Sequence, residues 1–451
     1  MNSKSAIAVF ALIVATHGAA TIIAAEQSPA GPLAAYVAKP DDSYGWVTRR
    51  QGQLSGCEVA ELTLTSQTWR DIVWKHQLFL IKPEQVVEPS HAMLLIDGGR
   101  WSDSLAQPPG RAETWPAIAL LWTQVARRIK SPLAVVRQVP HQPIFGHLVE
   151  DDAISYSFEQ FLKTGDEQWP LLLPMVKSAV RAMDATQDFA RRHWNLQIKT
   201  FTVTGASKRG WTAWLTGAVD ARVTALAPQV IDVLNIPAHM KLQMDTWGQY
   251  SEQIADYTRR GLQQQLATPA GNSLTAIIDP YSYRQALGQP KLIVLGTNDR
   301  YWPLDALNLY WNDLPGQKYI LYVPNNGHGL RDLARVIGSI GALHQQAKGR
   351  LRLPKLDWQL EETAGKLCLR VRSDPAPQRV DAWIATSHSR DFRDARWTSQ
   401  PARAADGQFV YEVPLPASGY LALFGEAVYQ ADGEPYWLST NVKIVGAKAR
   451  Q

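Results

Sequence analysis

Runs of apolar residues alternate with segments of helical periodicity through most of the chain. Apolar or alternating runs predict eight strands, at 58–65, 78–82, 92–97, 133–138, 198–204, 223–227, 291–295 and 319–323. Helical spacing occurs between them, at 116–129, 168–192, 304–314 and 330–346. Buried strands that alternate with helices are typical of a largely parallel sheet covered on both faces. We therefore predict an α/β domain over residues 26–353.

The pattern changes after Leu353-Pro354. Short alternating runs separated by Asp, Gly, Pro and Ser predict strands at 357–372, 380–386, 409–414, 420–429 and 436–445. This spacing predicts an immunoglobulin-like β-sandwich over residues 354–451. It contains no cluster of residues suited to catalysis, so we interpret it as an accessory domain. We expect this domain to contact a partner in the cell envelope.

A candidate nucleophile follows the fifth predicted strand. Gly-Ala-Ser207-Lys-Arg-Gly at 205–210 separates that strand from a helix that begins near Trp211. A serine in a sharp strand-to-helix turn is the nucleophile elbow of α/β-hydrolases, although the usual spacing is G-x-S-x-G and Arg209 stands where the second glycine falls. The alternative is an ordinary turn with a capping serine.

A serine nucleophile needs a base and an acid that orients the base. Asp299 follows the strand at 291–295, and His328 follows the strand at 319–323. Both then lie at the carboxyl edge of the sheet, in the hydrolase order of serine, acid and histidine. Asp232, just past the sixth strand, is the alternative acid.

The remaining site predictions concern the surroundings of Ser207. The backbone N–H groups of Lys208 and Gly99 are predicted to form the oxyanion hole. An insertion at about 235–279 is predicted to form a cap. Candidate pocket residues are Arg100, Arg209, Trp247 and Trp302.

Two alternatives remain open for the charged groups near Ser207. Residues 150–152 (Glu-Asp-Asp) either cap a helix or line the site. The cations Arg100, Lys208 and Arg209 favour an anionic substrate, unless Arg209 pairs with a structural carboxylate, in which case a neutral ester or short peptide is favoured.

Composition narrows the function. The 451 residues carry a net charge of +5 that is scattered along the chain, which argues against nucleic-acid binding. Cys57 and Cys368 are too far apart in sequence for a metal-site pair. They either form one disulfide or remain two buried thiols.

The first 25 residues resemble a signal peptide. Lys4 precedes an apolar core at 6–16, and small residues allow cleavage after Ala20 or Ala25. The alternative is an uncleaved anchor. No later segment is long and apolar enough to span a bilayer. We expect a periplasmic or secreted protein.

Several motifs together resemble the PhoPQ-activated pathogenicity-related protein family of α/β-hydrolases. They occur at 36–46, 66–69, 74–78, 150–156, 203–211, 279–283, 290–299 and 323–328. The resemblance implies an α/β-hydrolase fold with a cap, and a triad of Ser207, Asp299 and His328.

These observations predict an exported serine hydrolase that cleaves an ester or amide bond through an acyl-enzyme. It needs no metal or organic cofactor, and its expected partner is a small-molecule or peptide substrate. The alternative is a non-catalytic envelope binding or adhesion protein on a hydrolase scaffold.

Overall fold

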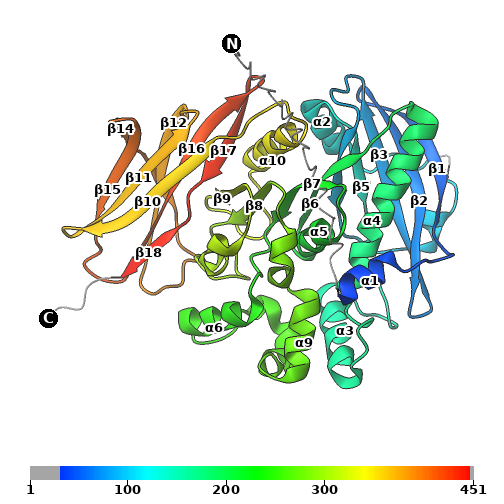
Figure 1. Ribbon diagram of the computed structural model, residues 1–451, viewed down its shortest axis with the longest axis horizontal. Helices are drawn as coiled ribbons and strands as arrows, with labels where there is room; N and C mark the ends of the chain where they lie inside the picture. The colour runs from blue at the N-terminus through cyan, green and yellow to red at the C-terminus, as the bar shows by residue number, and fades with distance from the viewer. Residues whose placement is uncertain (1–30, 111, 447–451) are drawn as a thin grey trace, which may run out of the picture.

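The computed structural model describes residues 31–110 and 112–446 (Figure 1). The predicted signal peptide, residues 1–25, lies outside the described residues. Within them, no helix has the length and apolar character needed to cross a membrane.

The first nine strands form a mostly parallel sheet. They are β1 (Gly45–Leu54), β2 (Cys57–Trp69), β3 (Ile72–Pro83), β4 (His91–Ile96), β5 (Leu133–Val136), β6 (Thr200–Ala206), β7 (Val223–Gln229), β8 (Lys291–Gly296) and β9 (Lys318–Val323). Their spatial order is β1-β2-β3-β5-β4-β6-β7-β8-β9. The pairs from β5 to β9 are parallel, whereas β1, β2 and β3 form antiparallel pairs. Without β1, this is the strand order of the α/β-hydrolase fold, so the predicted fold class is confirmed.

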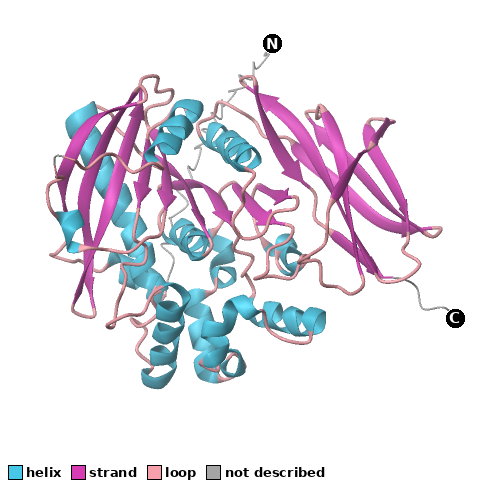
Figure 2. Cartoon of the chain, turned by 180° about the vertical axis from the view of Figure 1, so that it is seen from behind, coloured by secondary structure: helices cyan, strands magenta, loops and turns pink. Residues whose placement is uncertain are grey.

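In the described part of the chain, ten α-helices surround this sheet. They are α1 (Pro32–Ala38), α2 (Ala119–Ile129), α3 (Glu150–Thr164), α4 (Leu172–Phe189), α5 (Lys208–Val219), α6 (Ile236–Trp247), α7 (Ala255–Arg259), α8 (Leu262–Gln265), α9 (Pro269–Ile278) and α10 (Leu333–Ala347). Helices α3, α6 and α9 gather at one end of the molecule (Figures 1 and 2).

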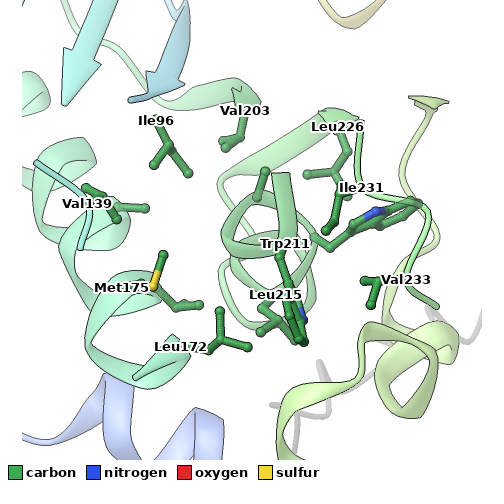
Figure 3. Packing of buried hydrophobic residues seen from close by; sticks show 14 of the residues in the cluster. Ile96, Val139, Leu172, Met175, Val203, Trp211, Leu215, Leu226, Ile231 and Val233 are labelled. Atoms are coloured by element: carbon green, nitrogen blue, oxygen red, sulfur yellow. The ribbon is translucent and has the colours of Figure 1, made fainter. Parts of the chain in front are cut away.

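The two faces of the sheet have separate hydrophobic cores because side chains alternate along each strand. In β3, Leu78 and Leu80 pack in the core of α4 and α5, whereas Phe79 and Ile81 pack in the core of α2 and α10. All four side chains are fully buried. Figure 3 shows the first core around α5, with Trp211 and Leu215 on the helix itself.

One predicted helix is wrong. Residues 304–314 form two short 3-10 turns, η5 (Ala306–Leu309) and η6 (Trp311–Asp313). The Lys318 ammonium donates to the backbone carbonyls of Trp311 and Leu314. It takes the place of the backbone N–H groups that would bind these carbonyls in a continuous helix. Further 3-10 turns are η1 (Asp103–Ala106), η3 (Glu252–Ile254) and η4 (Pro280–Ala286), and η2 (Ala190–Trp194) is a π-helical turn.

The C-terminal strands form a β-sandwich, as predicted. They are β10 (Lys355–Thr363), β11 (Lys366–Asp374), β12 (Arg379–Ser387), β13 (Thr398–Pro401), β14 (Arg403–Ala405), β15 (Gln408–Pro414), β16 (Tyr420–Ala431), β17 (Glu434–Ser439) and β18 (Lys443–Gly446). One layer has the order β10-β11-β15-β14, and the other contains β17, β16, β12 and β13. The run at 357–372 is a hairpin and not one strand, because Ala364 and Gly365 both have positive φ and turn the chain.

The sandwich extends the hydrolase sheet. Strand β17 pairs with β9 through Ser439 and Ile320, and the Tyr322 N–H donates to Ser439 Oγ at 3.0 Å. These contacts cover the β9 edge, which would otherwise expose unpaired backbone groups. Cys57 and Cys368 are both buried free thiols, so the disulfide alternative is wrong.

Candidate active site

Ser207 occupies a strained turn between β6 and α5. Its φ of 59° and ψ of −131° lie in a region that non-glycine residues rarely adopt. A Cβ on Gly205 would come 2.7 Å from the Arg209 carbonyl oxygen, and one on Gly210 would come 2.7 Å from Ile231. The two glycines therefore allow the turn and the close packing of α5. This explains the longer G-x-S-x-x-G spacing.

Ser207, His328 and Asp299 form a continuous chain of hydrogen bonds. His328 Nε2 lies 2.8 Å from Ser207 Oγ, and His328 Nδ1 lies 2.8 Å from Asp299 Oδ2. The other Asp299 oxygen accepts the Tyr301 N–H at 3.0 Å. The Tyr301 ring stacks on the imidazole, with ring centroids 4.2 Å apart. These contacts fix the orientation of the imidazole.

Asp232, the alternative acid, takes no part in the hydrogen bonds of the His328 ring. Its side chain is only 2% exposed, and its Oδ1 atom has no hydrogen-bond partner among the described residues. Burial raises the pKa of Asp232 to about 7, and the nearby carboxylates of Asp299 and Asp305 add to this effect. The carboxylate that contacts His328 is therefore that of Asp299.

Arg209 connects the elbow to the loop after β5 and to α3, and its guanidinium lies against Gly98 in the loop after β4. Its Nε donates to the Val139 carbonyl at 2.5 Å, and its two terminal nitrogens bind Glu150 at 2.7 and 2.6 Å. A Cβ on Gly98 would come 2.5 Å from this guanidinium. Glycine at 98 is thus required by the arginine that replaces the usual second glycine of the elbow.

The loop at 97–100 is also held by Gln142. The Gln142 side chain donates to the Gly99 carbonyl at 2.9 Å and to Glu150 at 2.6 Å. It accepts the Glu150 N–H at 2.8 Å, where Glu150 has a φ of 51°. The Lys208 N–H is at the start of α5, where no intrahelical acceptor exists. The predicted oxyanion donors, Lys208 and Gly99, therefore lie in one network.

The charges near Ser207 neutralise one another. Lys208 Nζ lies 3.0 Å from Glu150 and 2.8 Å from Asp151, and Asp151 also accepts from the Tyr257 hydroxyl at 3.0 Å. Burial acts to raise the pKa of Glu150, but Arg209 and Lys208 outweigh it and lower the pKa to about 2. Glu150 and Asp151 thus occupy the first turn of α3 and also border the site.

The loops that carry Asp299 and His328 are held by the β-sandwich. The Asn298 side chain donates to the carbonyls of Ala395 at 2.7 Å and Arg393 at 3.2 Å. Asn325 and Trp397 exchange two hydrogen bonds, of 3.0 and 2.8 Å. All three partners belong to the loop between β12 and β13, residues 388–397.

A cavity of about 90 Å³ lies beside Ser207. Helices α6 to α9 fill the connection between β7 and β8 and cover it. Asp279 holds the two ends of this cap together, since it accepts the N–H groups of Asn235, Ile236 and Tyr281 at 3.2, 2.8 and 2.9 Å.

The four pocket candidates occupy different places. Trp302 lines the cavity, whereas Arg100, Arg209 and Trp247 do not. Arg100 is exposed. Trp247 packs under Arg393 of the β12–β13 loop, whose guanidinium carbon lies 4.2 Å from the ring centroid.

Sequence reasoning missed Gln142, Asn298 and the β12–β13 loop. The one available signal was Arg209 itself. A buried arginine next to a nucleophile requires a carboxylate partner, and Glu150 lies in the motif at 150–156.

The chain matches a known family over most of its length. A family model described as PhoPQ-activated pathogenicity-related protein matches residues 33–393. Autocrine proliferation repressor protein A of Dictyostelium discoideum is 30% identical over 433 residues, which cover 88% of this chain and 86% of the relative. The resemblance drawn from the sequence motifs is confirmed.

Two solved esterase structures are similar to this chain at lower sequence identity. Acetyl xylan esterase 1 from Thermoanaerobacterium sp. JW/SL YS485 has a TM-score of 0.44 and 16% identity, and the similarity covers 69% of this chain and 92% of that chain. An acetyl xylan esterase from Paenibacillus sp. R4 has a TM-score of 0.44 and 12% identity, and the similarity covers 68% and 91%. The fold assignment itself rests on the strand order of the sheet.

Proposed function

The chain belongs to the PhoPQ-activated pathogenicity-related protein family, and we propose that it is an exported serine hydrolase that cleaves an ester or amide bond. The observation that carries this proposal is the hydrogen-bonded chain from Asp299 through His328 to Ser207. The strained backbone of Ser207 and the adjacent cavity support it further.

In the proposed mechanism, Ser207 Oγ attacks the substrate carbonyl carbon while His328 Nε2 takes the hydroxyl proton. Asp299 stabilises the imidazolium that forms. The N–H groups of Lys208 and Gly99 donate to the oxyanion. His328 then gives its proton to the leaving alcohol or amine, which departs and leaves an acyl-enzyme.

Water completes the cycle. His328 Nε2 accepts a proton from a water molecule, and the resulting hydroxide attacks the acyl carbonyl. Collapse of the second tetrahedral intermediate breaks the bond to Ser207 Oγ, which regains its proton from His328. The products are a carboxylic acid and the free enzyme.

A fluorophosphonate probe tests this proposal because it modifies activated serines. We expect labelling of the full chain to be lost in Ser207→Ala, with hydrolysis of aryl esters reduced by a factor of roughly 10,000 or more. Ser102→Ala, at an exposed serine, is the control and is expected to react like wild type. Equal labelling of wild type and Ser207→Ala would contradict the proposed nucleophile.

The same experiment addresses a non-catalytic binding role. A vestigial site is expected to have Ser207 and His328 out of reach of each other, or no cavity above the serine. The 2.8 Å contact and the cavity argue for catalysis instead. The export part of the proposal predicts a mature chain that begins after Ala20 or Ala25, which intact mass measurement of protein from the periplasm or medium can test.

A further inference from the structure

The cavity beside Ser207 is almost entirely apolar. Its walls come from α3, from α5, from the segment after β7, from the cap and from the loop after β8, and its apolar members include Phe158, Trp211, Ile236, Leu262, Leu274 and Ile278. These side chains are at most 8% exposed. Figure 3 shows that Trp211, Ile231 and Val233 meet beside the elbow helix. A substrate group that enters here leaves water for a hydrocarbon environment.

The few charged groups of the wall do not call for a charged ligand. Lys208 Nζ is within 3.0 Å of both Glu150 and Asp151. The Tyr257 hydroxyl occupies the other Asp151 oxygen. An anionic or cationic group placed in the cavity would have to break these pairs, and burying a charge without a partner costs several kcal/mol. The lining therefore selects a neutral group.

The position of His328 decides which part of the substrate enters the cavity. His328 must protonate the leaving group, so the leaving group lies on the side of His328 Nε2. The cavity is lined by Ser207, by Lys208 and by Tyr301, whose ring stacks on the imidazole, but not by His328 itself. The part of the substrate that remains bonded to Ser207, the acyl group, is thus the part that the cavity receives.

The volume limits the size of that group. A space that holds a single water has a volume of roughly 10–15 Å³, so a cavity of about 90 Å³ has room for on the order of six to nine non-hydrogen atoms. An acetyl group would leave most of this space empty. A linear acyl chain of about six to eight carbons would fill it.

We propose that this cavity is an acyl-binding site and that the enzyme prefers esters of neutral, medium-chain carboxylic acids. This inference rests on the proposed serine hydrolase function and adds the substrate class to it. Each methylene buried in the cavity is expected to raise kcat/KM about fourfold until the cavity is full.

A series of p-nitrophenyl esters from acetate to dodecanoate, hydrolysed by the full chain, tests this. We expect kcat/KM to rise at least tenfold from acetate to hexanoate and to fall again by dodecanoate. A constant or falling rate from acetate to hexanoate would overturn the acyl-site proposal and leave the serine hydrolase proposal intact. If no ester is hydrolysed and the fluorophosphonate does not label Ser207, both proposals fall.

A matched pair of variants on α6 locates the effect. Met240 lines the cavity from a partly exposed position, whereas Met244, one turn later, is 41% exposed and does not line it. Met240→Trp is expected to lower kcat/KM for hexanoate at least tenfold and to change acetate hydrolysis less than threefold. Met244→Trp is expected to change neither. Equal losses on both esters in Met240→Trp would contradict the acyl site.

Discussion

Ion pairs hold the nucleophile side of the site, whereas uncharged hydrogen bonds hold the acid–base side. On the nucleophile side, Arg209 and Lys208 bind the carboxylates of Glu150 and Asp151 within the hydrolase fold. On the acid–base side, the side chains of Asn298 and Asn325 bind backbone groups of the β12–β13 loop. Asn298 precedes the acid, and Asn325 lies in the loop that carries His328. The β-sandwich therefore forms part of the support of the proposed triad.

The acid–base side also has ion pairs, and those of Arg300, the residue after Asp299, lie at the surface. Arg300 pairs with Glu252 at 2.7 Å and with Asp394 at 3.0 Å, and the side chains of these three residues are 43, 46 and 89% exposed. Exposed pairs of this kind contribute little to stability. The buried amide contacts are expected to fix the loop, and the surface charges to matter less.

The largest effect is expected from Asn298→Ala. This variant removes the amide that binds the carbonyls of residues 393 and 395, directly before Asp299. A shift of the acid by about 1 Å can reduce the rate on the order of 100-fold, so we expect kcat on a p-nitrophenyl ester to fall 10- to 100-fold with KM changed less than threefold.

Asn312→Ala, at an exposed asparagine, is the control for Asn298→Ala and is expected to keep full activity. The pH dependence of kcat/KM separates positioning from general destabilisation, because a displaced Asp299 stabilises the imidazolium less well and shifts the acidic limb toward lower pH. Full activity in Asn298→Ala would show that the β-sandwich does not position the acid.

A smaller effect is expected on the nucleophile side. Arg209→Met removes the bonds to Glu150 and to the Val139 carbonyl, while Lys208 still neutralises Glu150. We expect a loss of about 2 kcal/mol in the free energy of unfolding and a roughly tenfold lower kcat because the 97–100 loop loses its support.

Arg209→Lys tests whether charge or geometry matters at this position. Lysine keeps the charge but cannot form the two parallel bonds to Glu150. We expect it to behave like Arg209→Met in kcat and to recover part of the stability. A lysine variant with wild-type kcat would mean that charge alone supports the oxyanion loop.

The same contrast explains what the sequence could predict. The eight strands from β2 to β9 were predictable because their apolar runs are long, whereas β1 was missed because it has few apolar residues and none of its residues is buried. The places of Ser207, Asp299 and His328 at strand ends followed from chain order alone. Their hydrogen-bonded distances did not.

The supports of the site depend on contacts between distant parts of the chain. Arg209 and Glu150 are 59 residues apart, and Asn298 lies 97 residues from Ala395. No local pattern specifies such pairs. Trp247 illustrates the point, because an aromatic residue on a cap helix suits a pocket wall equally well, and only the fold reveals that Arg393 covers it.

The two sides also differ in how they respond to pH. Glu150 stays ionised above about pH 4 because its pKa is lowered to about 2. Asp232, on the acid–base side, stays neutral below about pH 7 because burial raises its pKa from 3.8 to about 7. The folded protein therefore binds this proton more tightly than the unfolded chain does, and the stability that Asp232 contributes falls as pH rises from about 4 to about 7.

The last variant, Asp232→Asn, is expected to act on stability alone. Asparagine does not titrate, so the variant should gain stability relative to wild type by about 2 to 3 kcal/mol between roughly pH 5 and pH 8. Urea unfolding of both proteins at the two pH values measures this difference.

Buried histidines such as His91, whose pKa is lowered to about 4 by burial and Lys348, act in the opposite direction but cancel in the comparison. Glu150→Gln is the matched control on the nucleophile side, and its stability relative to wild type should change little over the same range because Glu150 is ionised in the folded protein and largely ionised in the unfolded chain. A constant difference for Asp232→Asn as well would mean that Asp232 is ionised in the folded protein, and the contrast between the two sides would not extend to their charge states.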